Sequence, residues 1–301
     1  EPAVKTLVSV IESKYLAFAT KATANFAGAD NTAISSLLVP GQARSRLNQN
    51  LAPKGNRYVQ MDSLTMAGLV NGMSAYFNPA TAVGDQFKEG LVARTAMADY
   101  YENERVWNLT NSADVTVTTA AAAAVTDGGT NITLASVASA TTAGMVFTVA
   151  GVYACHPETK QSLGYLQPYV VVTGGTTTQE VSPATILTGP RQNVCSAASA
   201  QLATTAYNGT SVAVTFSGAA STTYAQPLMY HKEAFQFVTA DLPIMDDASK
   251  CVRRTQDGLS LRVWQASDIR NDEMLMRIDI LYGMSALRPE WGCRMIGAAA
   301  S

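Results

Sequence analysis

The first apolar residues of the chain recur at the three- and four-residue spacing that places them on one face of a helix. The residues opposite them are polar or charged, among them Lys5, Glu12 and Lys14. We therefore predict an amphipathic helix that begins near Val4. Its apolar face would comprise Val4, Leu7, Val8, Ile11, Tyr15 and Phe18.

Shorter elements are expected as far as residue 107. The apolar segment 34–39 would end at Pro40, because proline removes a backbone donor and interrupts a regular element. Residues 42–51 predict a second helix, and residues 58–61 predict a strand. A third helix would extend through Val70, with Asp62 or Ser63 accepting a free N–H group of its first turn. Residues 91–107 predict one or two further strands.

Period-two alternation in the remainder of the chain predicts strands. Residues 145–149, 169–173 and 212–216 are β-branched or alternate with small residues, and Gly174-Gly175 is typical of a hairpin turn. Phe235 and Phe237 share a face of a later strand. A final short strand is expected at residues 291–296. The longest alternation predicts one strand face with Met274, Met276, Ile278, Ile280 and Tyr282.

Charged side chains divide the chain into three zones. Residues 1–109 hold 19 of them, residues 110–220 hold 6, and residues 221–301 hold 19. The middle zone also contains 21 Thr and 9 Ser. This change at both edges predicts an α+β host interrupted by an all-β barrel or sandwich. The expected parts are residues 1–111 and 219–301 for the host, and residues 112–218 for the insertion.

Composition limits the function classes. Only 15% of the residues are charged, against about a quarter in soluble domains, and neutral surface favours association. Deep burial within one chain would explain the same composition. The net charge of −2 argues against an electrostatic DNA binder, and no apolar run approaches the roughly 20 residues of a membrane span. Because Glu1 starts the chain inside a helical pattern, we expect a segment to precede it.

The sequence holds no catalytic, cofactor or metal constellation. The two histidines are His156 and His231, and the four cysteines are widely spaced without a C-x-x-C pair, so zinc and a dense disulfide framework are not expected. Phosphate-loop, nucleophile-elbow and H-E-x-x-H patterns are missing. The paired acids at 246–247 and 272–273 fit solvated turns better than acid–base chemistry. We predict a protein that is not an enzyme.

Basic and aromatic groups offer the remaining candidate surfaces. Tyr100, Tyr101 and Trp107 could stack on bases or pack in a core. The densest basic group is Arg44, Arg46, Lys54 and Arg57, which could contact nucleic acid or an acidic neighbour. The separate pair Arg253-Arg254 could do the same. A solvated face is the better interpretation of both, and a subunit interface or a DNA-facing surface is the functional alternative.

Several strings, in order along the chain, resemble the coat protein of the Salmonella podophage type. This is the branch of tailed-phage major capsid proteins that carries an inserted β-domain. The strings are YFNP at 76–79, DQFKEG at 85–90, FTVAGV at 147–152, HPETKQSLG at 156–164, YHKEAF at 230–235, and the C-terminal RIDILYG at 277–283 with ALRPE at 286–290.

The resemblance implies the shell fold of tailed phages (HK-ninety-seven-like) with an inserted barrel. The helix from Val4 would be the spine helix, residues 31–109 the peripheral domain, and the last zone the central domain. The implied partners are copies of the chain in hexamers and pentamers, a scaffolding protein, a portal protein and packaged double-stranded DNA, with no membrane and no cofactor. The implied location is the virion, assembled in the bacterial cytoplasm. Residues 118–133 contain one charge, Asp127, so the charged inter-capsomer loop of the family is not expected.

Two other interpretations stay open. A nanocompartment or defective-prophage shell would share the fold but enclose other cargo. A secreted, Thr-rich β surface or adhesion protein would belong to a different class, and a signal peptide in the full gene would distinguish it.

Overall fold

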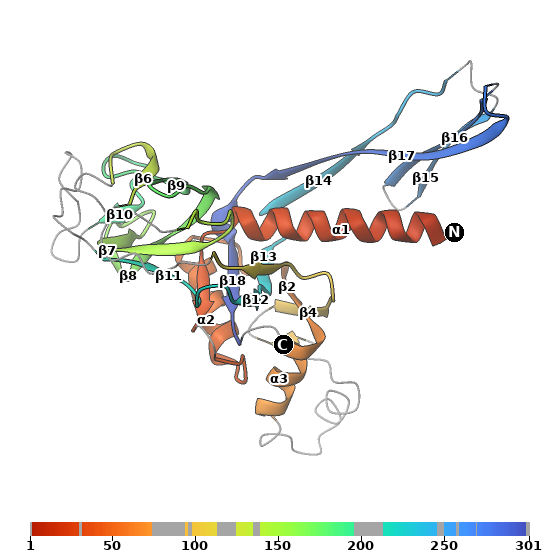
Figure 1. Cartoon of the computed structure of the whole chain (residues 1–301). Helices are drawn as coiled ribbons and strands as arrows, with labels where there is room; N and C mark the ends of the chain where they lie inside the picture. Colours follow the sequence, from red (N-terminus) through yellow and green to blue (C-terminus); the bar gives the residue numbers. More distant parts are fainter. Residues whose placement is uncertain are drawn as a thin grey trace.

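The computed structural model describes residues 2–29, 32–73, 94–95, 98–112, 125–134, 139–195, 213–245, 250–256, 259–268 and 270–298. The chain is mixed α and β, and mostly β. A long helix lies across the centre of the molecule, with a sheet at either end of it and a mixed layer beneath (Figure 1).

Among the described residues, three α-helices lie in the first quarter of the chain. Helix α1 spans Pro2–Ala22 and confirms the predicted amphipathic helix. Helix α2 spans Leu38–Gln49, and helix α3 spans Ser63–Met73. The Oδ2 atom of Asp62 accepts the N–H of Thr65 at 3.1 Å, which confirms Asp62 as the N-terminal cap of α3.

The expectation that Pro40 ends an apolar segment was wrong. Pro40 lies in the first turn of α2 and is buried there. A first-turn N–H has no carbonyl partner within the helix, so proline loses no hydrogen bond at this position. Leu37 and Val39 pack against the core beside it.

The central sheet combines strands from both ends of the sequence. Its order is β1 (Phe26–Gly28), β18 (Gly292–Ile296), β13 (Leu228–His231), β2 (Arg57–Met61), β4 (Ala98–Glu102) and β3 (Arg94–Thr95). Helix α2 packs on β1 and β18. The buried residues of this core include Leu47, Val59, Met61, Leu69, Met229, Cys293 and Met295. The predicted strands at 58–61 and 291–296 are therefore confirmed as β2 and β18.

A second sheet uses only residues of the middle zone. Its order is β10 (Val194–Cys195), β7 (Val146–Cys155), β8 (Ser162–Thr173), β9 (Thr178–Thr185) and β6 (Gly129–Thr133), and β11 (Val214–Phe216) also pairs with β7. The hairpin predicted at Gly174-Gly175 joins β8 to β9, with Val171 opposite Val181. The separate core of this sheet includes Val125, Ile132, Leu134, Phe147, Tyr169, Val194 and Phe216.

The chain passes between the two sheets through one short antiparallel pair. Strand β5 (Asn108–Thr110) pairs with β12 (Thr223–Ala225). The hydroxyls of Thr110 and Thr223 are 2.8 Å apart. The amide of Asn111 donates to the carbonyls of Ser217 and Ala219 at 3.0 and 3.1 Å. Entry to and exit from the middle zone thus lie side by side.

The last sheet projects from the body and has the order β14 (Phe235–Ala240), β17 (Glu273–Ala286), β16 (Leu259–Asp268) and β15 (Lys250–Gln256). Residues 281–286 of β17 pair with β14. Residues 273–280 pair with β16 instead. Strand β17 therefore carries β16 and β15 past the N-terminal end of α1 (Figure 1). A 3-10 turn, Pro289–Trp291, then leads into β18.

Candidate interaction surface and its junctions

One face of the projecting sheet carries a row of apolar side chains, and those near its outer end are exposed. Cross-strand register places Ile278 opposite Val263, which in turn lies opposite Val252. Of the side chains on this face, Met274 is 78% exposed and Met276 is 60% exposed. A contiguous exposed apolar patch is typical of a surface that contacts another molecule. The apolar residues of this face, which we call the apolar face, are Val252, Leu261, Val263, Met274, Met276, Ile278 and Ile280, and the register also places Arg254 and Gln265 among them.

The opposite face of the same sheet is fixed by charged groups. Arg262 donates to Asp279 at 2.6 Å and to the carbonyl of Pro243 at 2.9 Å. Arg277 also donates to Asp279, and Arg253 lies 3.5 Å from Asp241. The hydrogen bond from Arg262 lowers the pKa of the Asp279 carboxyl, with Arg277 adding to the effect. Segment 241–243 is thereby held against this face, and the apolar face stays open.

Nearer the body, the same sheet packs on α1. The rings of Tyr15 and Phe237 meet edge to face with centroids 5.6 Å apart, and Phe237 stacks on Tyr282 at 5.8 Å. Burial raises the pKa of the Tyr15 hydroxyl to about 12, so this ring stays neutral. These rings fix the direction in which β14 and β17 leave the body.

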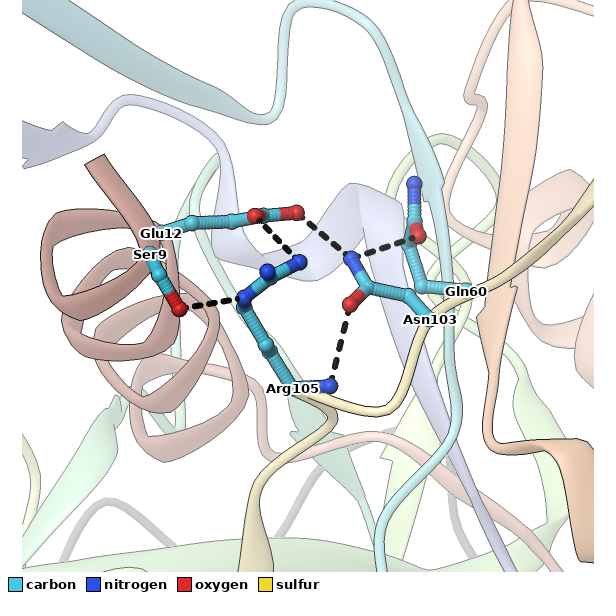
Figure 2. Close-up of polar contacts among 5 residues, drawn as sticks. All are labelled: Ser9, Glu12, Gln60, Asn103 and Arg105. Atoms are coloured by element: carbon cyan, nitrogen blue, oxygen red, sulfur yellow. Dashed lines mark hydrogen bonds and ion pairs between the residues drawn. The ribbon is translucent and has the colours of Figure 1, made fainter. Parts of the chain in front are cut away.

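A polar network also holds α1, through Ser9 and Glu12 (Figure 2). Arg105 donates to Ser9 at 2.7 Å and lies 3.1 Å from Glu12. The amide of Asn103 donates to Glu12 at 2.6 Å and to Gln60 of β2 at 3.4 Å, and its oxygen accepts the backbone N–H of Arg105 at 2.9 Å. The turn after β4 is thus bonded to both α1 and β2.

A buried arginine joins α1 to both sheets. Arg294 of β18 is fully buried and donates to the carbonyls of Thr20 at 2.8 Å, Thr23 at 3.0 Å and Gly144 at 2.7 Å. Thr20 belongs to the last turn of α1, where free carbonyls favour a cation, and Gly144 precedes β7. Burial lowers the pKa of the Arg294 guanidinium to about 9, so the group stays charged at neutral pH.

Two further cations lie over aromatic rings at the boundary between the second sheet and the rest of the chain, since Tyr165 belongs to β8 and Trp107 packs against the core of the second sheet. The guanidinium of Arg46 on α2 lies 3.2 Å from the ring centroid of Tyr165 on β8. The ammonium of Lys21 lies 5.1 Å from the ring centroid of Trp107. Cations over aromatic faces are attracted by the ring quadrupole, more strongly where water is excluded.

The structure places the six basic candidates, a group of four and a separate pair in the sequence, at different depths. Arg57 is 2% exposed and donates to the carbonyls of Ala52 and Pro53 at 2.7 and 2.8 Å, so its side chain faces the interior. The guanidinium of Arg46 lies over the ring of Tyr165, and the side chain of Arg44 is half-buried. The remaining three, Lys54, Arg253 and Arg254, are exposed. The local sequence does not indicate how deeply each of these side chains is buried, because all six residues are long and basic.

The three aromatic residues considered as a stacking surface also differ in exposure and location. Tyr100 is 4% exposed and Tyr101 is 49% exposed, because neighbouring residues of β4 point to opposite faces. Trp107 packs against the core of the second sheet. The three rings therefore do not form a common stacking surface.

The histidines have structural partners. Nδ1 of His156 accepts the backbone N–H groups of Glu158 and Thr159 at 3.2 and 3.3 Å. Nδ1 of His231 accepts the N–H of Glu233 at 3.3 Å, and its ring meets Trp291 edge to face. Within the described ranges, no group of three His, Cys, Asp or Glu side chains could hold a metal. Residues 246–247 lie outside the described residues.

Comparison with known proteins identifies the family. A sequence model of the P22 coat protein (gene protein 5) matches residues 87–297. The chain belongs to the P22 coat protein family. The matched range includes the second sheet, the projecting sheet and most of the central sheet. The resemblance noted from the sequence strings is thereby confirmed.

Solved structures include a similar capsid chain. It is from the capsid structure of the cyanophage P-SCSP1u, with 10% sequence identity and a TM-score of 0.39. The alignment covers 98% of this chain and 63% of the cyanophage chain, so this chain spans less than two thirds of that length. Among curated proteins, none matches this chain. In the part of the chain that the structure describes, no helix is long and apolar enough to cross a membrane.

Proposed function

We propose that this P22-family chain is a major capsid subunit that assembles with copies of itself into the icosahedral shell around phage DNA. The observation that carries the proposal is the uncovered apolar face of the projecting sheet. Met274 and Met276 cost free energy in water, and burying each against a neighbouring subunit would stabilise a contact by about 2 kcal/mol. Many such modest contacts, repeated around each subunit, hold a closed shell together.

We further propose the HK-ninety-seven-like shell fold, with α1 as the spine helix. Residues 112–218 would form the inserted domain between host parts 1–111 and 219–301. Three observations support this division. The second sheet has its own core, the β5–β12 pair brings entry and exit together, and the central sheet combines strands from both flanks. A domain inserted where two host segments lie close disturbs the host little.

The proposed partners are hexamers and pentamers of the chain, scaffolding and portal proteins, and packaged double-stranded DNA. With a net charge of −2, DNA would be neutralised mainly by its own counterions. The exposed Lys54, Arg253 and Arg254 are the candidates from the predicted basic group for non-specific phosphate contact or for an acidic neighbour. Assembly would take place in the bacterial cytoplasm.

Electron microscopy of the full gene product tests this function. We would express it with and without a neighbouring scaffolding gene and image negatively stained material. Closed uniform shells, or sheets of hexamers, are expected. A monodisperse monomer under both conditions would contradict the proposal and favour a surface protein. Shells that contain protein cargo in place of DNA would indicate a nanocompartment.

A further inference from the structure

Two cysteines lie diagonally across a strand pair in the second sheet. Cys155 ends β7 and Cys195 ends β10, with Cys195 opposite Tyr153 and the N–H of Cys155 donating to Asn193 at 3.0 Å. Because every second residue of a strand points to the same face, Cys155 and Cys195 share one face. The thiol of Cys195 reaches across the pair to the carbonyl of Ala154, with a distance of 3.8 Å. Both cysteines are free thiols in this structure.

The surroundings of the two thiols differ. Cys155 lines a cavity of about 400 Å³ between the second sheet and the host, whereas Cys195 is fully buried and does not line it. The cavity wall also carries the charged Lys160, Arg191 and Glu290. A small reagent that enters the cavity therefore meets Cys155 before it can reach Cys195.

We propose that Cys155 and Cys195 form an oxidisable pair that a peroxide converts into an intrachain disulfide. The Cys155 thiolate attacks one oxygen of hydrogen peroxide, breaks the O–O bond and becomes a sulfenic acid, and the leaving hydroxide takes up a proton to become water. The Cys195 thiol, losing its proton, then attacks the Cys155 sulfur and displaces hydroxide, which leaves as a second water. Two thiols are oxidised by two electrons, and one peroxide is reduced to two waters.

The environment makes this reaction slow at neutral pH. Burial, with a smaller contribution from the neighbouring Cys195, raises the pKa of the Cys155 thiol to about 11, although Lys160 acts in the opposite direction. The thiol form is a poor nucleophile, so the reduced pair persists until the oxidant is abundant. Below this pKa, the thiolate fraction and the oxidation rate rise about tenfold per pH unit.

The bond would secure a weakly paired strand. Strand β10 pairs with β7 through two residues, Val194 opposite Ala154 and Cys195 opposite Tyr153. A covalent link at this end would prevent β10 from separating from β7 and would remove conformational freedom from the unfolded chain. The oxidised protein should therefore melt at a higher temperature than the reduced protein.

Peptide mapping of the full chain after treatment with hydrogen peroxide tests the proposal. The wild type should yield the Cys155 peptide joined to the Cys195 peptide under non-reducing conditions. With Cys195→Ser, the reaction should stop at a Cys155 sulfenic acid that dimedone traps. With Cys155→Ser, Cys195 should stay unreacted. The linking rate should rise about tenfold per pH unit between pH 7 and 9.

A matched control is Cys293→Ser, which removes another fully buried thiol and should leave the link unchanged. Circular dichroism before treatment establishes that each variant is folded, and Cys155→Ala replaces Cys155→Ser if the latter is not. Wild-type Cys155 that proceeds to sulfinic acid without linking would overturn the proposal. So would full retention of both thiols at pH 9, or oxidation of Cys195 in the Cys155 variant.

Discussion

At the scale of single residues, buried arginines connect the parts of this molecule. Arg294 bonds the end of α1 to the turn before β7, and Arg57 bonds the turn before β2. Each guanidinium donates several N–H groups to backbone carbonyls of neighbouring segments. From the sequence alone such an arginine would be taken for a surface charge, but here it connects separate segments of the fold.

Replacing Arg294 should destabilise the fold strongly. Arg294→Met leaves the carbonyls of Thr20, Thr23 and Gly144 without their donor, and we expect a loss of about 3 kcal/mol or more. Arg294→Lys retains the charge but not the fork of donors, and should give an intermediate loss. Urea unfolding measures both values. The exposed Arg254→Met serves as control and should change the free energy of unfolding by less than about 0.5 kcal/mol. Equal effects at the two positions would refute the structural role of Arg294.

At the scale of elements, strand identity followed from the sequence but strand environment did not. The alternation in β17 predicted a strand with Met274 and Met276 on one face, and the strand is present. The pattern did not indicate that these two side chains are among the most exposed apolar residues. The spacing of apolar residues along a strand indicates which side chains share a face. Only the neighbouring elements determine whether that face is covered.

The ion pairs of Asp279 with Arg262 and Arg277 make the stability of the projecting sheet depend on pH. Because the folded-state pKa of Asp279 is lowered by Arg262 and Arg277, its contribution is present above the unfolded pKa of about 3.9 and is lost as the pH falls through the folded value. Asp279→Asn should therefore destabilise the protein at pH 7, and the difference from wild type should shrink below about pH 4.

Denaturant unfolding of both proteins at pH 7, 5 and 3 measures this dependence. Asp272→Asn, in the exposed turn before β17, is the matched control and should differ little from wild type at any of these pH values. A difference for Asp279→Asn that stays constant down to pH 3 would show that the lost carboxylate charge is not the cause.

At the scale of the whole molecule, the exposed sheet and the family membership point to the same behaviour. The projecting sheet extends beyond α1, away from both cores, so its apolar face lies within reach of a second molecule. A face of this kind on a monomer promotes association. In a coat protein, the association that such a face would serve is ordered assembly with further subunits.

A charge on this face should prevent assembly without unfolding the chain. Met276→Glu places a carboxylate in the proposed contact, where its desolvation costs more than the lost apolar contact. Because the side chain is 60% exposed, the thermal melt should stay close to wild type. Electron microscopy and size-exclusion chromatography should then show subunits in place of shells, while Met276→Leu should still assemble. Normal shells from Met276→Glu would exclude this face from the subunit contacts.

The sequence by itself determined the long helix α1, most strands, the cap at Asp62, the hairpin at Gly174-Gly175 and the family, since each depends on local periodicity, turn chemistry or ordered residue strings. Tertiary structure decided the rest. It placed Pro40 inside a helix, buried Arg57, set Cys155 beside Cys195 and left the face with Met276 open. These outcomes depend on contacts between residues that are distant in sequence. The free energy of burying a side chain is set by those contacts, and no local pattern records them.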